Sequence, residues 1–467
     1  MAGSRTAFIA PAGYGKTHAI VDRVGSSPAK TLVLTHTNAG VTAINCRLRE
    51  VGIGRPSFNL STIAAYCELW ARAYPEISGF DALAGLASSE RYERIYPAAK
   101  RVFSEKWAQR VIGASYSYVI VDEYQDCTVD QRDALFSLAA EMDLVVYGDP
   151  MQGVFYWAGA LADMRDPSFD VRMLDSRPYR WINADAEELG SEIARIREEL
   201  LPTLCGEGVS VRLRRDVRGL TVIDPTNADR GGLLRLFARY GARRSFLYLT
   251  AREAGELSFC KRNPGFQVNE TIECTPLTEW CARLETSTGA EHALRLLEFA
   301  ELCFTGLSSD LKPYKKRLEA GDIDFGRMRK HPELSRLLVD SAVGGGHGSD
   351  FAVLDWMERS SAGFRVVRGQ LLGEMKRALR HASARSMSLA EAVVETHGGM
   401  ESYEARYGFR HVASRTVLSK GLEYDVVAVD AATIKDPRDF YVAVSRCRVG
   451  LIIVTESDVL HFKGVAR

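Results

Sequence analysis

The chain has no run of about 20 apolar residues, which is the length that a membrane-spanning helix needs. Its first ten residues lack a basic segment followed by a long apolar run, so no secretion signal is expected. Internal repeats and low-complexity tracts are missing as well. We therefore expect neither a membrane anchor nor an exported protein.

Cysteine is present nine times, an odd number, at scattered positions and without a Cys-x-x-Cys pair. A disulfide scaffold uses paired cysteines, and zinc or iron–sulfur sites use closely spaced ones. The pattern predicts a reducing, cytoplasmic location and argues against zinc and iron–sulfur clusters.

Net charge is also missing, because 60 basic side chains balance 60 acidic ones. Nucleic acid would have to be bound by a local groove, since no global attraction exists. Residues 311–330 carry seven basic against three acidic side chains, and residues 359–385 carry seven against one. Each run is either part of such a groove or a solvated helix face.

Residues 4–10 (SRTAFIA) read as a strand, and residues 16–24 read as a helix, with a glycine-containing loop between them. This order is that of a P-loop, in which backbone N–H groups and the helix N-terminus bind phosphates. Lys16 is expected to reach the β and γ oxygens, and the Thr17 hydroxyl to bind Mg²⁺. The alternative is an ordinary glycine-rich turn. The expected nucleotide-binding residues here are Ala12, Gly13, Gly15, Lys16 and Thr17.

An apolar run, residues 118–121 (YVIV), is followed by the acidic pair Asp122 and Glu123. Ligand sites of open parallel sheets lie at the carboxyl ends of the strands. Asp122 can hold Mg²⁺, and Glu123 can accept a proton from an attacking water. A solvated turn is the alternative for such a pair, and the buried run before it disfavours that alternative.

A third strand-like run, residues 144–147, ends in a polar segment with Gln152 and continues into aromatic residues. Gln152 is expected to sense the phosphate, and Trp157 to stack on a base. Burial in the core is the alternative for Trp157.

Together these segments and four others resemble the motifs of the UvrD/Rep group of superfamily-one helicases, in the right order and over nearly the whole length. The resemblance rests on residues 10–17, 35–38 with Arg47, 121–126 with Gln131, 148–160, 178–180, 419–425 and 441–446. It implies an ATP-hydrolysing motor with two RecA-like domains, an α/β fold of parallel sheets flanked by helices, with helical insertions in each.

The resemblance also implies roles for single residues. Tyr179 would stack on the nucleobase with His18 on its other side, Arg180 would contact the γ-phosphate, and Arg446 would stabilise the transferring phosphoryl group. Gly421 and Glu423 would face the ribose. Contacts with single-stranded nucleic acid are implied for His36, Thr37, Asn38, Thr62, Trp157 and Lys420.

Several positions depart from the family pattern. Ala64, Ala158 and Val417 stand where the family has histidine, arginine and histidine, and His36 replaces a common phenylalanine. The adenine-reading segment expected before the P-loop is not seen. ATP chemistry is therefore expected to be intact, with fewer contacts to the strand.

A chain of 467 residues exceeds the roughly 250–300 at which one core stops growing, so several domains are expected. Residues 1–63 and 116–175 would form RecA-like domain 1A, with residues 64–115 as a short helical 1B-like insertion. Residues 176–254 and 411–467 would form domain 2A, with residues 255–410 as a mainly helical 2B-like insertion. The nucleotide would bind between the two RecA-like domains.

The expected cofactors are ATP and Mg²⁺, and the expected partner is single-stranded DNA or a duplex with a single-stranded tail. By resemblance the motor would be a DNA helicase or translocase that moves 3′ to 5′, in anti-phage defence or in DNA repair. The compact chain, with residues 275–277 (TPL) opening a helical insertion, also resembles the helicase-like subunit of the Gabija anti-phage system. That resemblance implies a partner nuclease of the OLD type. The alternative function is a non-unwinding ATPase that regulates a nuclease complex.

Overall fold

The computed structural model describes most of the chain. The described residues are 3–81, 88–156, 159–174, 177–241, 243–252, 254–270, 274–326, 328–344, 346–360, 363–396 and 410–465. The chain divides into two compact units, each of which is described by itself. The first unit comprises Met1–Val222, Lys420–Glu423 and Ile434–Arg467, and the second comprises Ile223–Ser419 and Tyr424–Thr433.

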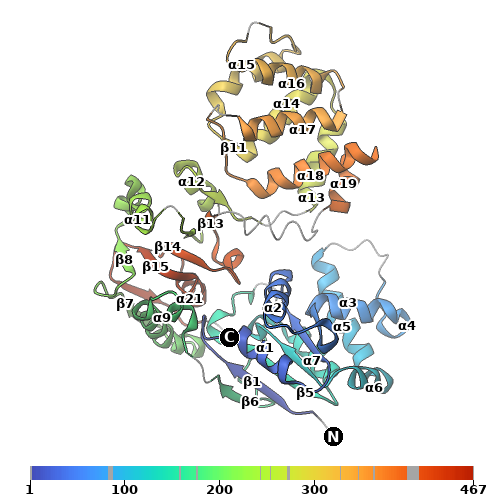
Figure 1. Ribbon diagram of the computed structural model, residues 1–467, viewed down its shortest axis with the longest axis vertical. Coiled ribbons are helices and arrows are strands. Elements are labelled where there is room, and N and C mark those ends of the chain that lie inside the picture. The colour runs from blue at the N-terminus through green and yellow to red at the C-terminus, as the bar shows by residue number, and fades with distance from the viewer. Residues whose placement is uncertain are drawn as a thin grey trace. The chain divides into compact units, whose positions relative to one another are not determined.

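The first unit is built on a six-stranded sheet with the strand order β3-β2-β4-β5-β1-β6 (Figure 1). Every neighbouring pair in this sheet is parallel. Its strands are β1 (Arg5–Ile9), β2 (Thr31–Thr35), β3 (Phe58–Thr62), β4 (Tyr118–Val121), β5 (Asp143–Gly148) and β6 (Asp170–Met173). All carboxyl ends therefore point to one edge, where polar residues from different strands can meet.

Helices cover both faces of this sheet, which explains its continuous apolar strands. Val33, Ile120 and Val145 pack with α1 (Lys16–Ser26) and α2 (Asn38–Glu50) on one face. Leu34 and Val121, neighbours of two of these residues, point to the other face and pack with α7 (Val129–Leu138). The central strands are thus fixed on both sides.

Four helices lie between β3 and β4 in the chain. They are α3 (Ile63–Ala73), α4 (Pro75–Ser78), α5 (Ser88–Phe103) and α6 (Lys106–Ser115). Tyr66 of α3 and Phe103 of α5 are buried in the same apolar cluster as the face of the sheet that α7 covers.

The remainder of the first unit follows β6. It contains α8 (Tyr179–Ile182), α9 (Glu187–Leu200), β7 (Val209–Arg212), β8 (Leu220–Ile223), α21 (Pro437–Val444), β15 (Cys447–Val454) and β16 (Val459–Phe462). β7 and β16 form a small antiparallel sheet. The segments at positions 178–180 and 441–446 thereby belong to the same compact unit as the P-loop.

A second six-stranded sheet has the order β10-β13-β9-β14-β15-β8. In the second unit, β9 (Phe246–Leu249) lies between β13 (His411–Ser414) and β14 (Tyr424–Asp430), and β13 also pairs with β10 (Gln267–Val268). These pairings are parallel. The short helices α10 (Pro225–Asn227), α11 (Leu233–Tyr240) and α12 (Gly255–Arg262) accompany them.

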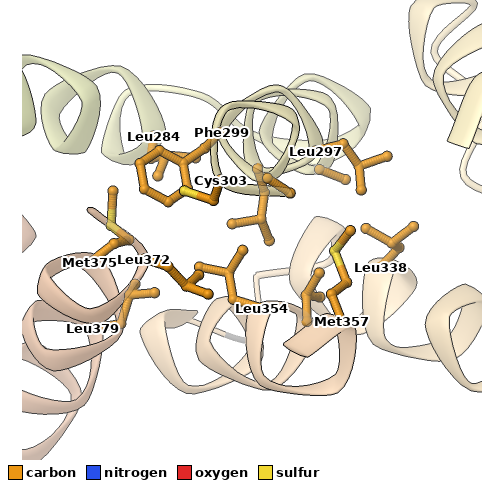
Figure 2. Packing of buried hydrophobic residues seen from close by; sticks show 14 of the residues in the cluster. Leu284, Leu297, Phe299, Cys303, Leu338, Leu354, Met357, Leu372, Met375 and Leu379 are labelled. Atoms are coloured by element: carbon orange, nitrogen blue, oxygen red, sulfur yellow. The ribbon is translucent and has the colours of Figure 1, made fainter. Parts of the chain in front are cut away.

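The helical part of the second unit forms its own apolar core. Figure 2 shows Leu284, Phe299 and Cys303 facing Leu372 and Met375 in this core. Its helices are α13 (Cys274–Glu285), α14 (Gly289–Cys303), α15 (Ser308–Glu319), α16 (Pro332–Ala342), α17 (Gly346–Arg359), α18 (Gly369–Arg385) and α19 (Leu389–Thr396). The short strands β11 (Phe304–Thr305) and β12 (Arg365–Val366) pair antiparallel beside them.

The predicted fold class is confirmed, because two six-stranded sheets are flanked by helices and helical insertions interrupt both series of strands. The boundaries of the four domains stay a prediction. In the part of the chain that the structure describes, every helix is too short or too polar to cross a lipid bilayer.

Candidate functional site

The loop between β1 and α1 has the backbone shape that close phosphate binding needs. Gly13 and Gly15 have φ angles of +74° and +80°, a region that residues with a side chain rarely adopt. A Cβ atom at Gly13 would lie 2.9 Å from the Trp181 ring, and one at Gly15 would lie 3.1 Å from the Tyr179 ring. Glycine is therefore required at both positions, and α8 packs directly on the loop.

Lys16 begins α1 and turns its ammonium group toward the loop. Its Nζ donates to the carbonyl oxygens of Ala10 at 3.0 Å and Pro11 at 3.3 Å. Among the described residues, no carboxylate lies within 4.0 Å of this atom. Burial lowers the pKa of Lys16, although nearby carboxylates including Glu123 and Asp149 oppose this. A nearly buried cation without an ion pair suits an anionic ligand such as phosphate.

Three other predicted nucleotide-binding residues lie around the loop. The backbone N–H of Ala12 donates to the Tyr441 hydroxyl at 3.0 Å, which links the loop to α21. Thr17 is the second residue of α1. His18 lies on the exposed side of α1 and its Nε2 is 3.3 Å from a carboxylate oxygen of Asp22.

The acidic pair lies at the carboxyl end of β4, at the same edge of the sheet as the P-loop. Asp122 is buried and accepts from the backbone N–H of Glu123 at 3.0 Å. Glu123 has a φ of +56°, a conformation that is strained for a residue with a side chain. Such strain accumulates at functional sites, and here it turns the backbone sharply after the strand.

The two carboxylates have opposite pKa shifts. Burial, together with the charge of Glu123, raises the pKa of Asp122. Burial alone would also raise the pKa of Glu123, but the ammonium groups of Lys420 and Lys16 outweigh it and lower that pKa. Glu123 is therefore a carboxylate at neutral pH and able to accept a proton. The Thr17 hydroxyl and the Asp122 carboxylate are hard oxygen donors that suit Mg²⁺.

A buried network surrounds Gln152 in the 3₁₀ turn after β5. The Gln152 side-chain amide donates to Asp149 at 3.1 Å, and its carbonyl oxygen accepts from Arg446 at 3.2 Å. Asp149 also accepts from Arg197 of α9, with donor–acceptor distances of 2.8 Å and 3.2 Å. The Arg197 and Asp149 side chains are 4% and 0% exposed. Gln152 is thereby fixed between an aspartate and an arginine.

Both predicted arginines reach this part of the first unit. Arg180 lies in α8 and donates to the Glu423 carboxylate at 2.6 Å and to the backbone oxygen of Ser445. Burial lowers the pKa of Arg446 to about 10, so its guanidinium stays charged at neutral pH. Tyr179 is 43% exposed and leaves its ring open to a ligand.

Lys420, predicted to contact nucleic acid, lies against the acidic segment. Its ammonium group donates to the Asp126 carboxylate and, at 2.5 Å, to the backbone oxygen of Gln152. It also lies 5.3 Å from the centre of the Phe155 ring and 4.0 Å from Glu123. The neighbouring Gly421 has a φ of +79°, which favours glycine there.

The other predicted nucleic-acid residues follow β2 and β3 at the same edge of the sheet. Thr37 caps α2 by accepting from Gly40 at 3.0 Å, and Thr62 caps α3 by accepting from Ala65 at 3.1 Å. Asn38 is the first residue of α2. Trp157 lies outside the described residues.

His36 sits between the same edge and the acidic segment. Its Nε2 is 3.3 Å from the Cys127 sulfur. Burial, and then the charge of Lys420, lowers the pKa of His36 to about 4. Its ring is therefore neutral at neutral pH and would contribute stacking rather than charge.

Three further residues support the site, although the sequence reasoning assigned no role to any of them. Gln125 donates to Glu123 and accepts from the backbone N–H of Asp149 at 3.0 Å. Arg197 and Tyr441 contact Asp149 and Ala12, as described above. Gln125 and Tyr441 had a signal, because they lie in the motif segments 121–126 and 441–446, whereas Arg197 had none.

The basic run on α18 is mostly paired. Lys376 donates to Asp355 at 2.6 Å and also to Glu358, and Arg377 donates to Glu374 at 3.3 Å. Arg385 pairs with Glu395 at 3.0 Å. These pairs favour the solvated helix face over a nucleic-acid groove for this run.

Comparisons with known proteins agree with part of this picture. Residues 80–165 match the UvrD/REP helicase N-terminal domain family, and this segment contains Asp122, Glu123 and Gln152. No curated protein sequence matches the chain.

Two solved arterivirus structures are similar to it. One is described as a complex of nonstructural protein 10 (helicase) with DNA, with 8% identity and a TM-score of 0.35, covering 97% of this chain and 60% of that chain. The other, a crystal structure of the same viral protein, has 9% identity and a TM-score of 0.29, with coverages of 97% and 59%. This chain therefore spans about 60% of the length of those chains.

Proposed function

We propose that this protein is an ATP-dependent helicase or translocase that acts on single-stranded DNA. The observation that carries the proposal is the convergence, within the first unit, of the P-loop with side chains from four distant segments: Asp122 and Glu123, Gln152, Arg180, and Arg446. The match of residues 80–165 to a helicase domain family supports it. Phosphoryl transfer to water requires carboxylates, a side-chain amide and cationic groups around the bound phosphates, and these groups surround the loop here.

Each residue has one task in this proposal. The loop N–H groups and Lys16 bind the phosphates of ATP. Mg²⁺, held by Thr17 and Asp122, supplies neutralisation of the phosphate charge when it is bound. Glu123 accepts the proton of the attacking water, because its low pKa keeps it ionised. Arg180 and Arg446 stabilise the charge that develops on the transferring group.

The base and ribose of ATP would lie beside α8. The exposed Tyr179 ring is positioned against Gly15 and would stack on the base. Gly421 and Glu423 would face the ribose, and Glu423 would have to share or release Arg180 when the nucleotide binds. His18 is the weaker stacking partner, because its imidazole pairs with Asp22 on the exposed face of α1.

The strand would cross the edge of the sheet that carries His36, Thr37, Asn38 and Thr62, with Trp157 and Lys420 as further contacts. Gln152 connects this edge to ATP, because its backbone oxygen holds Lys420 and its side chain holds Arg446. A change at the γ-phosphate that moves Arg446 would therefore move Lys420 as well. Movement from 3′ to 5′ is proposed from the resemblance alone.

The alternative is a cytoplasmic ATPase subunit that does not unwind DNA but controls a nuclease partner of the OLD type, in phage defence. Lys420 favours this alternative, because its ammonium group is taken up by Asp126 and Gln152 and only 9% of the side chain is exposed. A lysine that is paired in this way responds to changes at the ATP site more readily than it binds a phosphate backbone. Repair remains the other physiological role for a translocase.

Steady-state ATP hydrolysis by the full chain, with and without single-stranded DNA, tests the proposal. Lys16→Ala should lose most turnover, and Glu123→Gln should bind ATP but hydrolyse it very slowly, whereas the exposed Glu141→Gln should match the parent. Strong stimulation by DNA supports a translocase. Turnover that DNA does not change supports the partner-controlled ATPase, and normal turnover by Glu123→Gln would refute the site.

A further inference from the structure

A hollow of about 250 Å³ lies on the first unit, between α3, α6 and the start of β3. Its walls include Asn59, Leu69, Trp70, Tyr74, Ile112 and Tyr116. Leu69 is 62% exposed and Tyr74 is 37% exposed, so the hollow opens to solvent. Exposed apolar groups around a concave surface indicate a binding site more often than scattered ones do.

One wall is a ladder of aromatic rings. Trp70 and Tyr74 stack at 5.7 Å with an interplanar angle of 28°, and Tyr74 lies 4.6 Å from the ring of Trp107. Trp70 also contacts Trp107 at 6.4 Å. The ladder is held from below by the buried Tyr66 and thus presents flat faces in fixed positions.

Polar groups line another wall of the hollow. The Asn59 side-chain amide donates one hydrogen to the Tyr116 hydroxyl at 2.8 Å, which leaves its second hydrogen as a donor and its carbonyl oxygen as an acceptor. Lys30 is exposed, and its Nζ lies 5.9 Å from the centre of the Tyr116 ring. No carboxylate among the described residues lies within 4.0 Å of this ammonium group. The wall therefore offers hydrogen bonds and, at its edge, an unpaired positive charge.

The hollow is separate from the nucleotide site. Lys30, Asn59 and Tyr116 lie at or just before the amino ends of β2, β3 and β4, whereas the P-loop and the acidic pair follow carboxyl ends. With a rise of about 3.3 Å per residue, a five-residue strand separates the two edges by roughly 15 Å. A ligand in the hollow would not compete with ATP.

We propose that the hollow binds a nucleobase, with the attached phosphate on Lys30. Flat aromatic faces attract any base, a donor and an acceptor on one wall suit its polar edge, and a cation suits its phosphate. The volume admits one base and is too small for a helix of a partner protein. If the base belongs to single-stranded DNA, the inference rests on the proposed function. The hollow would then be a second contact with the strand, besides the edge of the sheet that carries His36 and Thr62. A free mononucleotide is the other source of the same chemistry.

Fluorescence anisotropy with the full chain and a labelled 20-nucleotide oligothymidine tests this inference, beside the same backbone with abasic sites. Leu69→Glu and Tyr74→Ala should raise the Kd for oligothymidine by about 5- to 100-fold, the range for loss of one base stack. Neither should change the Kd for the abasic strand. Val51→Glu, a residue 56% exposed and outside the hollow, is the matched control and should bind like the parent.

Two further measurements separate the outcomes. Lys30→Gln leaves the apolar wall intact. It should reduce the slope of log K for strand binding against log salt concentration by about one released ion. Calorimetry with dTMP identifies which ligand supplies the base. If Leu69→Glu abolishes dTMP binding but leaves the affinity for the strand unchanged, the hollow binds a free nucleotide.

Equal strand affinity in all variants, with no dTMP binding, overturns the inference but leaves the proposed function standing. The hollow would then be left to an apolar side chain of a partner protein. A parent protein that binds neither the strand nor dTMP would overturn both.

Discussion

Replacing Arg197 by methionine should destabilise the first unit and slow ATP hydrolysis. The change keeps an unbranched apolar side chain in place of the methylene stem but removes the charge that faces Asp149, whose side chain is 0% exposed. Breaking a buried ion pair from one side costs about 3–5 kcal/mol, because the remaining charge is left without a partner. Among the described residues, the Gln152 amide and the backbone N–H of Met151 then remain as the hydrogen-bond donors to Asp149.

Hydrogen–deuterium exchange of peptides from β5 and α9 measures the effect where it arises. A loss of 3–5 kcal/mol corresponds to exchange that is roughly 10²- to 10⁴-fold faster. Arg172→Met in β6 is the matched control, because Arg172 is 61% exposed and pairs with Asp170, which is 56% exposed, at the surface of the same unit. Surface pairs contribute about 0.2–1 kcal/mol, so the control should accelerate exchange by less than about tenfold.

The double change Arg197→Met with Asp149→Asn should recover much of the stability, since no charge remains buried. It should not recover kcat, because an amide at position 149 holds Gln152 less firmly than a carboxylate does. Equal exchange rates in Arg197→Met and Arg172→Met would refute the reasoning. So would full kcat in Arg197→Met, because Gln152 would then be fixed by something other than this pair.

Three other changes have clear expected outcomes. Gly15→Ala should raise the KM for ATP by about tenfold, because the new residue would have a strained positive φ and its Cβ would lie 3.1 Å from Tyr179. Gly52→Ala would have a similar strain but no atom within 4 Å of its Cβ, so it should leave the KM unchanged in the same assay. His292 donates to the Asp350 carboxylate on α17, and this hydrogen bond raises the pKa of His292. The protonated histidine therefore stabilises the fold below about pH 6.5, and this stabilisation is lost as the pH rises through the folded pKa. Thermal unfolding at several pH values should show this loss in the parent and not in His292→Gln. Leu354→Ala should cost the helical core about 2–5 kcal/mol in urea unfolding, because the side chain is fully buried, and a cost below 1 kcal/mol would contradict the packing.

Local patterns were sufficient for the parts of the site that lie within one segment. A strand, a glycine loop and a helix predicted the P-loop, and the structure has β1, the loop and α1 in that order. An apolar run before two acids predicted that Asp122 and Glu123 follow a buried strand, as they follow β4. These features depend on residues within about ten positions, so the sequence contains the whole signal.

Contacts between distant segments could not be predicted in this way. Arg197 and Asp149 are separated by 48 positions, and nothing in either local sequence specifies the other. An arginine on an amphipathic helix is usually solvated, and only the packing of α9 makes this one buried. The same holds for Lys420, because nothing in its motif specifies that its ammonium group donates to Asp126.

Gln152 links segments of the network that are distant from one another in the sequence. Its backbone oxygen, its side-chain oxygen and its side-chain amide contact Lys420, Arg446 and Asp149, so three segments are fixed by one residue. A glutamine has enough free rotation to adopt other arrangements, and the ordering of its side chain carries an entropic cost. The buried charge of Asp149, held by Arg197, offsets that cost and leaves one favoured orientation. In the proposed ATPase, departure of the γ-phosphate would then act on Lys420 through Arg446 and Gln152.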